Sequence, residues 1–219
     1  MEKLYSFDSR YYMTTICVRS EYFEWGIWGK WKNPSLIDIP FSKMVTPQPD
    51  IDPNELSNAT EYLIYGDYRD WMQFPIVYHI VDGKRFRDII DIRWQYSYLI
   101  SDRLKTLLEQ AQVTGWKSYP ITLYDKKGNL VEGYHGFTIT GRAAQCDNAD
   151  ECYADLMKNP GRRTVRPIFN LKNWDGSDIF RIAKSKLVVT ERVVKLMRAN
   201  KIQAIDVHPL EEEMDLYEG

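Results

Sequence analysis

The sequence predicts an α+β fold in which mostly antiparallel sheet dominates and a few helices pack on it. Short runs of β-branched and aromatic residues recur along the chain, separated by turn dipeptides and glycines, which is typical of antiparallel strands. Two stretches, residues 99–116 and 187–205, instead carry a polar capping residue followed by apolar residues at helical spacing. The chain has 219 residues, of which 44% are apolar and 14% aromatic, so it can bury a substantial core.

The first part of the chain, residues 1–84, is expected to form a β-rich aromatic lobe. Alternation in "YYMTTICV" predicts a strand. Trp25, Trp28 and Trp31 recur every three residues, but the glycines between them favour a loop with packed rings over a regular helix. Residues 33–59 hold five prolines, which leave room for one short helical turn and no long element. Because no flexible linker follows, this lobe and residues 85–219 are expected to pack tightly, as two lobes or as one domain.

The middle of the chain predicts several strands. The runs "EYLIYG" and "FPIVYHIVDGKR" are strand-like, and Asp82-Gly83 is a turn dipeptide that suits a hairpin. The next run, "RFRDIIDIRWQYSYLIS", is rich in apolar residues and ends in strand formers. Farther along, "SYPITLYD" predicts a strand, "KKGN" a turn, and "LVEGYHGFTITGR" its antiparallel partner.

A capped helix is predicted directly after the run that ends at Ser101. The Ser101 hydroxyl can accept a free backbone N–H of the first turn, and Asp102 suits the positive end of the helix. One helical face carries the apolar residues Leu104, Leu107, Leu108 and Ala111. Gly115 is expected to end the helical region.

A similar pattern returns 89 residues later. Thr190 takes the place of Ser101, and Glu191 that of Asp102. Val193, Leu196 and Met197 take the places of Leu104, Leu107 and Leu108, and Ile202 takes the place of Val113. Strand, capped helix and strand are therefore predicted twice. Either a true duplication or two examples of a common helix type explains the similarity, and both interpretations stay open.

The sequence carries little that predicts catalysis. There are three histidines, His79, His135 and His208, and each is interpreted as structural. Metal-binding histidine pairs, a nucleophile elbow and phosphate-binding glycine loops are missing from the sequence. Asp88 and Asp91 would share a face of a helix, but two carboxylates are too few ligands for a dedicated metal site. We therefore expect no enzymatic activity, catalytic residue, cofactor or bound metal.

The compartment is predicted from the N-terminus, the hydropathy and the cysteines. The first residues lack the basic and apolar regions of a signal peptide, and no apolar run approaches the roughly 20 residues of a membrane-spanning helix. Cys17, Cys146 and Cys152 have no metal-binding spacing, and Cys146 and Cys152, which lie in an acidic stretch, are interpreted as inert thiols. A cytoplasmic protein without membrane association is expected.

Charge is distributed unevenly along the chain. Residues 158–201 carry twelve Lys and Arg against three acidic residues, while the final "EEEMDLYEG" is acidic. The basic segment either pairs with the acidic tail or marks a surface for a partner. Nucleic-acid binding is the alternative function, with Phe169 and Trp174 as stacking residues, although no nucleic-acid-binding motif accompanies the charge.

The stretch "YLISDRLKTLLEQAQVTGWKSYPITLYDKKGNLVEGYHGFTITGRAAQCD" resembles the central block of a bacterial immunity-protein family of polymorphic toxin systems, formerly a domain of unknown function. The features that carry the resemblance are an I-S-x-R-L helix start, a glycine, a tyrosine-containing strand and an acidic loop residue, here Ile100, Ser101, Arg103, Leu104, Gly115, Tyr134 and Asp147. A later block of the family is similar to "IFRIAKSKLVVTERVVKLM", through Phe180, Arg181 and Thr190. The resemblance covers residues 85–207, and it departs at Ala204, where the family usually has glycine.

The resemblance implies a cytoplasmic bacterial protein of interbacterial competition that binds a cognate toxin domain and neutralises it by occlusion, without catalysis. Loop aromatics, arginines and the acidic tail are the expected contacts, since aromatic and Arg residues dominate interface energetics. The expected toxin-binding residues are Trp28, Trp31, Arg162, Arg163, Trp174, Glu211, Glu212 and Glu213. Core packing is the competing interpretation of the tryptophans. The acidic tail could also mimic nucleic acid toward a nuclease toxin.

Overall fold

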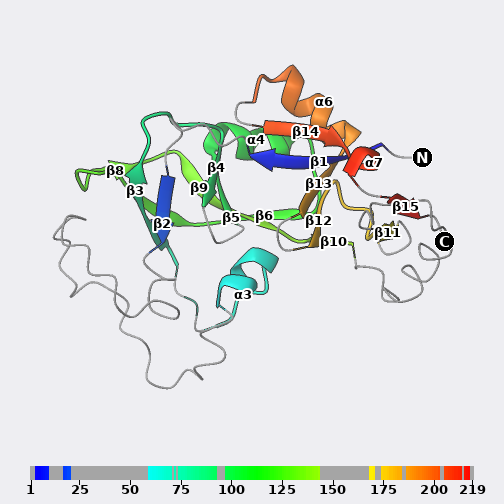
Figure 1. Ribbon diagram of the computed structural model, residues 1–219. Helices are drawn as coiled ribbons and strands as arrows, with labels where there is room; N and C mark the ends of the chain where they lie inside the picture. The colour runs from blue at the N-terminus through cyan, green and yellow to red at the C-terminus, as the bar shows by residue number, and fades with distance from the viewer. Residues whose placement is uncertain are drawn as a thin grey trace. The chain divides into compact units, whose positions relative to one another are not determined.

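The computed structural model describes part of the chain, namely residues 3–9, 17–20, 59–70, 72, 74–92, 97–143, 168–170, 174–183, 186–202, 205–213 and 215–217. The chain divides into two compact units. Unit 1 comprises Met1–Asp8, Ala111–Trp116 and Ile139–Gly219, and unit 2 comprises Ser9–Gln110 and Lys117–Thr138. The fold is α+β and dominated by sheet, as predicted (Figure 1).

Unit 2 is built on two sheets. The first has the strand order β2-β3-β7-β8, formed by Cys17–Ser20, Ile76–Asp82, Ile121–Tyr124 and Leu130–Val131. The second has the order β4-β5-β9-β6, formed by Ile89–Ile92, Ser97–Ser101, Tyr134–Ile139 and Trp116–Tyr119. Its helices are α3, Ala59–Tyr65, and α4, Asp102–Gln110. Strands β3 and β7 pair in parallel, whereas β4–β5, β5–β9, β2–β3 and β7–β8 are antiparallel.

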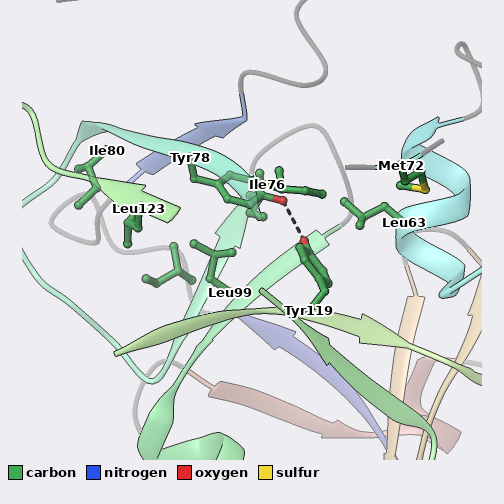
Figure 2. Packing of buried hydrophobic residues seen from close by; sticks show 10 residues of the cluster. Leu63, Met72, Ile76, Tyr78, Ile80, Leu99, Tyr119 and Leu123 are labelled. Atoms are coloured by element: carbon green, nitrogen blue, oxygen red, sulfur yellow. Dashed lines mark hydrogen bonds between the residues drawn. The ribbon is translucent and has the colours of Figure 1, made fainter. Parts of the chain in front are cut away.

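The core of unit 2 gathers apolar side chains from both sheets and from α3 (Figure 2). Its buried members are Leu63, Met72, Ile76, Tyr78, Ile80, Ile90, Ile92, Leu99, Tyr119 and Leu123. Two tyrosine hydroxyls lie inside this core, and they satisfy each other with a hydrogen bond of 2.8 Å between Tyr78 and Tyr119. Burial raises the pKa of Tyr119 to about 12. Burial also raises the pKa of Tyr78 well above its ordinary value, so both hydroxyls stay protonated at neutral pH.

Unit 1 is built on one five-stranded sheet. Its order is β10-β12-β13-β1-β14, formed by Gly141–Arg142, Ile179–Ala183, Lys186–Thr190, Leu4–Ser9 and Ile205–Pro209. Helix α6, Glu191–Ala199, lies along this sheet and buries Val193, Val194 and Met197 (Figure 1). A short helix α7, Leu210–Glu213, and a parallel pair of β11, Ile168–Asn170, and β15, Asp215–Tyr217, complete the unit. Its core includes Leu4, Ala143, Phe180, Ile182, Val188 and Leu210.

The predicted unit of strand, helix and strand occurs at both places, as β5-α4-β6 and β13-α6-β14. Each helix also follows an antiparallel hairpin, β4–β5 in one case and β12–β13 in the other. The helices bury equivalent side chains: Leu104 and Leu108 in α4, and Val193 and Met197 in α6. Shortly after each helix a non-glycine residue, Gln112 or Lys201, adopts a positive φ of 52°.

The correspondence extends to the third strand of each sheet. In unit 2 this strand is β9, which pairs antiparallel with β5 and places Tyr134 opposite Ser101. In unit 1 it is β1, which pairs antiparallel with β13 and places Leu4 opposite Thr190. The orders β4-β5-β9-β6 and β12-β13-β1-β14 therefore match strand by strand. One sheet takes its third strand from later in the chain, and the other takes it from the N-terminal segment.

Three local predictions were wrong. The run "EYLIYG" falls mainly in helix α3, where neighbouring Leu63 and Ile64 are both buried, a pattern that strand alternation does not give. Asp82-Gly83 does not close a hairpin, because β3 and β4 belong to different sheets. The run "SYPITLYD" is two strands rather than one, since the chain leaves β6 at Pro120 and enters β7 in the other sheet. The expected turn after β7 is confirmed, because β7 and β8 form an antiparallel hairpin. Only the first two residues of "LVEGYHGFTITGR" pair with β7, however, and the rest of this run forms β9 and β10 in other sheets.

The two units do not follow chain order, because β1 belongs to the same unit as the C-terminal strands. The two lobes expected from the sequence, residues 1–84 and 85–219, would instead follow one another along the chain. Much of the first expected lobe, including residues 21–58, lies outside the described residues. The division at residue 84 therefore stays a prediction.

Candidate binding surface

A buried aspartate, Asp88, holds the start of helix α4. It lies just before strand β4 and contacts the end of strand β5 and the first turn of the helix. Asp88 accepts a hydrogen bond of 2.9 Å from the hydroxyl of Ser101, and Arg103 Nη1 lies 3.5 Å from its other carboxylate oxygen. The Ser101 Oγ in turn accepts the backbone N–H of Leu104 at 3.2 Å, so it caps the helix as predicted. We call the set of Asp88, Ser101 and Arg103 the unit 2 clamp.

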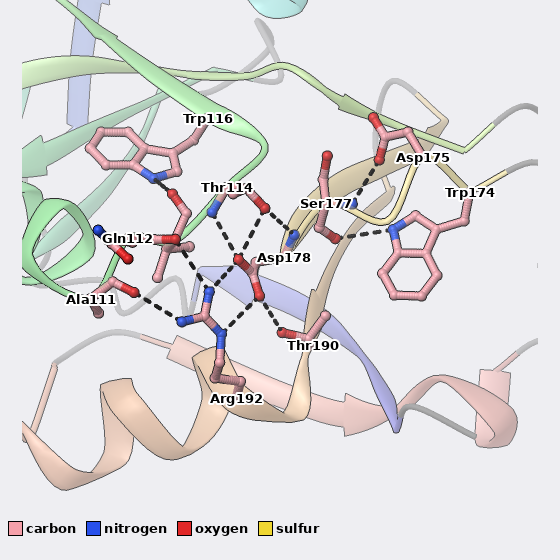
Figure 3. Close-up of polar contacts among 11 residues, drawn as sticks. Ala111, Gln112, Thr114, Trp116, Trp174, Asp175, Ser177, Asp178, Thr190 and Arg192 are labelled. Carbon is pink, nitrogen blue, oxygen red and sulfur yellow. Dashed lines mark hydrogen bonds and ion pairs between the residues drawn. The ribbon is translucent and has the colours of Figure 1, made fainter.

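Helix α6 begins at an equivalent set, Asp178, Thr190 and Arg192, which we call the unit 1 clamp (Figure 3). Arg192 binds both carboxylate oxygens of Asp178, and its Nη1 also donates to the carbonyl of Ala111 at 2.9 Å. Thr114 donates to Asp178 from its backbone nitrogen at 2.9 Å and from its hydroxyl at 3.0 Å. This carboxylate therefore holds together the helix start, the strand before it and the segment that follows α4 along the chain.

The electrostatics of the unit 1 clamp favour the ionised aspartate. Partial burial alone would raise the pKa of Asp178, but hydrogen bonds from Arg192 and Thr114 and the charge of Arg192 outweigh it, so the pKa is lowered. Thr190 occupies the N-cap position, as predicted, but its hydroxyl makes no hydrogen bond to the first helical turn. It donates to Asp178 Oδ1 at 3.3 Å instead.

The clamps explain why several residues of the sequence pattern are present. Asp88 and Asp91, considered above as a metal-binding pair on a helix, lie before and within strand β4, and Asp88 serves as the anchor of α4. Among the residues that the structure describes, no group of three or more His, Cys, Asp or Glu side chains is placed to hold a metal ion. The contacts of the two clamps hold the starts of α4 and α6.

The turn that leads into each clamp is very different in the two units. In unit 1 it closes on itself: Asp175 Oδ1 accepts the backbone N–H of Ser177 at 2.9 Å, and Trp174 Nε1 donates to the Ser177 carbonyl at 3.0 Å (Figure 3). Gly176 stands at its tip with φ +80°. Asp175 Oδ2 also accepts the backbone N–H of Arg142 at 2.8 Å. All of these contacts are internal to unit 1.

In unit 2 the corresponding turn, Lys84–Arg87, carries cations and an aromatic ring. Phe86 lies two residues before Asp88, just as Gly176 lies two residues before Asp178. The Phe86 side chain is 47% exposed. Its ring centroid lies 6.1 Å from that of Tyr134, and the Tyr134 hydroxyl donates to the carbonyl of Arg87 at 2.9 Å. Lys84 and Arg85 are exposed beside it. The turn therefore presents an aromatic side chain, flanked by basic residues, on a backbone that Tyr134 holds.

Acidic side chains lie close to Tyr134 at the start of α4 and before β9. Asp102, with its side chain 66% exposed, lies at the start of α4, and its Oδ1 is 2.6 Å from His135 Nε2. The backbone N–H of Asp102 donates to the carbonyl of Gly133, next to Tyr134. Glu132 is exposed one residue earlier. We define the unit 2 surface patch by its members on the turn, the strand and the helix start: Lys84, Arg85, Phe86, Asp102, Glu132, Tyr134 and His135.

Most of the expected toxin-binding residues cannot be placed. Trp28, Trp31, Arg162 and Arg163 lie outside the described residues, and for Glu212 and Glu213 only the backbone of α7 is described. Glu211 is exposed in α7. Trp174 packs its ring against Phe180 with centroids 5.3 Å apart, beside the core of unit 1. Its position agrees with the core interpretation, and toxin contact through these residues stays a prediction.

Several basic residues in the described part of the basic segment are engaged within unit 1. Arg181 is 2% exposed, Arg192 belongs to the unit 1 clamp, and Lys195 pairs with Glu191 at 2.9 Å. The arginines of "NPGRRTVRP" lie outside the described residues. Nucleic-acid binding through residues 158–201 therefore stays a prediction.

The sequence contains a signal for the unit 2 surface patch, but the signal is recognisable only when the two copies are aligned. "KRFRD" placed an aromatic residue among three cations, and it was interpreted as part of an apolar run that becomes strand. Comparison with "NWDGSD" in the second copy would have shown that Phe86 has glycine as its counterpart. Without the hairpin registers, however, the two turns cannot be aligned, because the hairpin loops differ in length.

None of the helices that the structure describes has the length and apolarity that crossing a bilayer requires. No protein-family model matches the chain, and no curated protein matches it.

Proposed function

We propose that this chain is a cytoplasmic immunity protein that binds a cognate bacterial toxin domain and neutralises it by covering a surface that the toxin needs. The observation that carries the proposal is the turn Lys84–Arg87. Its exposed Phe86 stands among cations, whereas the equivalent turn of unit 1 closes on itself around Gly176. Aromatic and arginine side chains are the commonest anchors of protein interfaces.

The sequence resemblance adds a second line of support. Ser101 and Arg103 belong to one clamp and Thr190 to the other, so the residues that carry the resemblance fall at equivalent positions of the two units. These residues include hydrogen-bonding side chains at the two helix starts as well as apolar positions, which supports the proposal. A protein of this kind acts through its folded surface.

The test is protection of living cells. An immunity gene adjoins the gene of its toxin, so the toxin domain encoded immediately upstream is expressed from an inducible promoter with and without this chain. We expect growth to be restored when both are present. An inactive variant of the toxin domain controls for the burden of expression. Unchanged killing by the toxin domain at matched levels of soluble chain would contradict the proposal.

A further inference from the structure

We infer that the unit 2 surface patch is the docking surface for the partner, and that the partner offers it an apolar pocket bordered by carboxylates. This inference rests on the proposed function and deepens it. The patch is a better candidate than the core tyrosines or the unit 1 clamp, because the hydroxyls of Tyr78 and Tyr119 are buried and Asp178 is occupied by Arg192 and Thr114.

The first step of the argument is that the fold does not require an aromatic residue at position 86. Unit 1 builds the same hairpin, clamp and helix with Gly176 at the equivalent place. Among the residues that the structure describes, the large apolar side chains left exposed are Phe86 and Leu130. The ring packs partly on Tyr134, but its exposed half gains no folding free energy, and we assign that exposed half to binding.

The second step is that the patch is held in place before any partner arrives. Tyr134 lies in β9 and bonds the Arg87 carbonyl, while Asp88, the next residue, is fixed by the unit 2 clamp. Burial, followed by the nearby charge of Asp88, raises the pKa of Tyr134 to about 12, so its hydroxyl remains a donor at physiological pH. A surface that is already ordered loses little conformational entropy on binding.

The third step concerns the chemistry of the partner. Lys84 and Arg85 are exposed beside the ring and favour carboxylates opposite them. Asp102 and Glu132 are exposed near Tyr134, where they would repel the evenly charged backbone of a nucleic acid. A protein surface can place an apolar pocket, carboxylates and a cation at separate positions, so a protein fits this patch better.

The test compares matched variants of the full chain against one probe, the purified inactive form of the toxin domain encoded immediately upstream. Phe86→Ala removes the ring, and Leu130→Ala removes an exposed apolar side chain outside the patch. We expect Phe86→Ala to raise Kd at least about 30-fold, the range of an interface anchor, and Leu130→Ala to change it less than about threefold. Thermal unfolding verifies that both variants are folded.

Two charge-reversal variants give an independent measurement if Phe86→Ala does not fold. Arg85→Glu is expected to slow association about tenfold at low salt, with a smaller effect at high salt, whereas Arg198→Glu on exposed α6 leaves association unchanged. Equal binding by wild type, Phe86→Ala and Arg85→Glu would overturn the docking surface while leaving the proposed function intact. Failure of the wild-type chain to bind or protect would overturn both. Salt-steep binding of DNA or RNA by wild type that Arg85→Glu abolishes would replace the protein partner with a nucleic acid.

Discussion

At the scale of single residues, Gly115 shows how closely the backbone of unit 1 is packed. Its φ is +86°, and a Cβ placed on it would lie 2.0 Å from the carbonyl oxygen of Ile179 and 2.7 Å from the Ser177 side chain. The carbonyl of Gly115 also accepts the backbone N–H groups of Thr140 and Gly141. The sequence predicted Gly115 as the end of the helical region, but α4 ends at Gln110, and close backbone approach is what requires a glycine here.

Gly115→Ala is therefore expected to destabilise the protein more than Gly128→Ala does. Gly128 has nearly the same positive φ, +83°, but open space around it, so alanine there costs only about 1 kcal/mol of backbone strain. The collision with Ile179 should add roughly 1–3 kcal/mol at Gly115. Denaturant unfolding of both variants measures the difference. Equal losses would show that the backbone near Ile179 yields without cost.

Asp178 is expected to make stability depend on pH. Because its pKa is lowered in the folded protein, it contributes stability above the unfolded-state value of about 3.9, and that contribution is lost as the pH falls through the folded-state value. We expect Asp178→Asn to lower the free energy of unfolding at pH 7. The gap between variant and wild type should narrow steadily below about pH 4, where the wild-type carboxyl group is protonated as well. A gap of constant size in denaturant titrations from pH 7 to pH 3 would contradict this account.

At the scale of secondary-structure elements, sequence reasoning was most successful for the two capped helices. The apolar spacing correctly predicted that Leu104 and Leu108 of α4, and Val193 and Met197 of α6, would be buried. Such a face depends only on local periodicity. Strand partners cannot be obtained in this way, because the neighbours of a strand are set by contacts far along the chain. The position of Asp88 was therefore missed, since its partner Ser101 lies across a hairpin.

The two helix starts are expected to respond differently to loss of their hydroxyls. Ser101 both donates to Asp88 and accepts from the backbone of Leu104, whereas the Thr190 hydroxyl only donates to Asp178. Asp178 also keeps its bonds from Arg192 and Thr114. We expect Ser101→Ala to cost about 1–2 kcal/mol and Thr190→Val about 0.5–1 kcal/mol. Thermal unfolding compares them, and a greater loss for Thr190→Val would contradict this ordering.

At the scale of the whole molecule, the two units repeat one arrangement but assemble it from different parts of the chain. The prediction of an α+β, sheet-dominated fold was confirmed, since it depended on composition and on many short runs. The origin of β1 could not be predicted, because nothing in "LYSFDS" indicates that its partner is β13, more than 180 residues later. Phe86 was missed for a similar reason, because its significance depends on comparing the two units.

Phe7→Ala is expected to weaken unit 1 selectively. Phe7 is buried in β1 opposite Leu187 of β13, and its removal should cost about 3–5 kcal/mol. Hydrogen exchange followed by mass spectrometry should show the greatest loss of protection in β13 and α6. Tyr5→Ala on the same strand, where the side chain is only partly buried, should cost less. Equal loss of protection throughout both units would contradict a selective effect.

The place of β1 has a consequence for synthesis on the ribosome. Strand β1 is made well before its partner, because β13 follows about 180 residues later, roughly 10–40 s at usual elongation rates. Until β13 is made, Leu4 and Phe7 have no sheet to join. The strands of unit 2, in contrast, have all been synthesised once residue 139 is added. Nascent chains should therefore acquire protease resistance in two stages, with unit 2 maturing first and unit 1 only after β13 has left the exit tunnel.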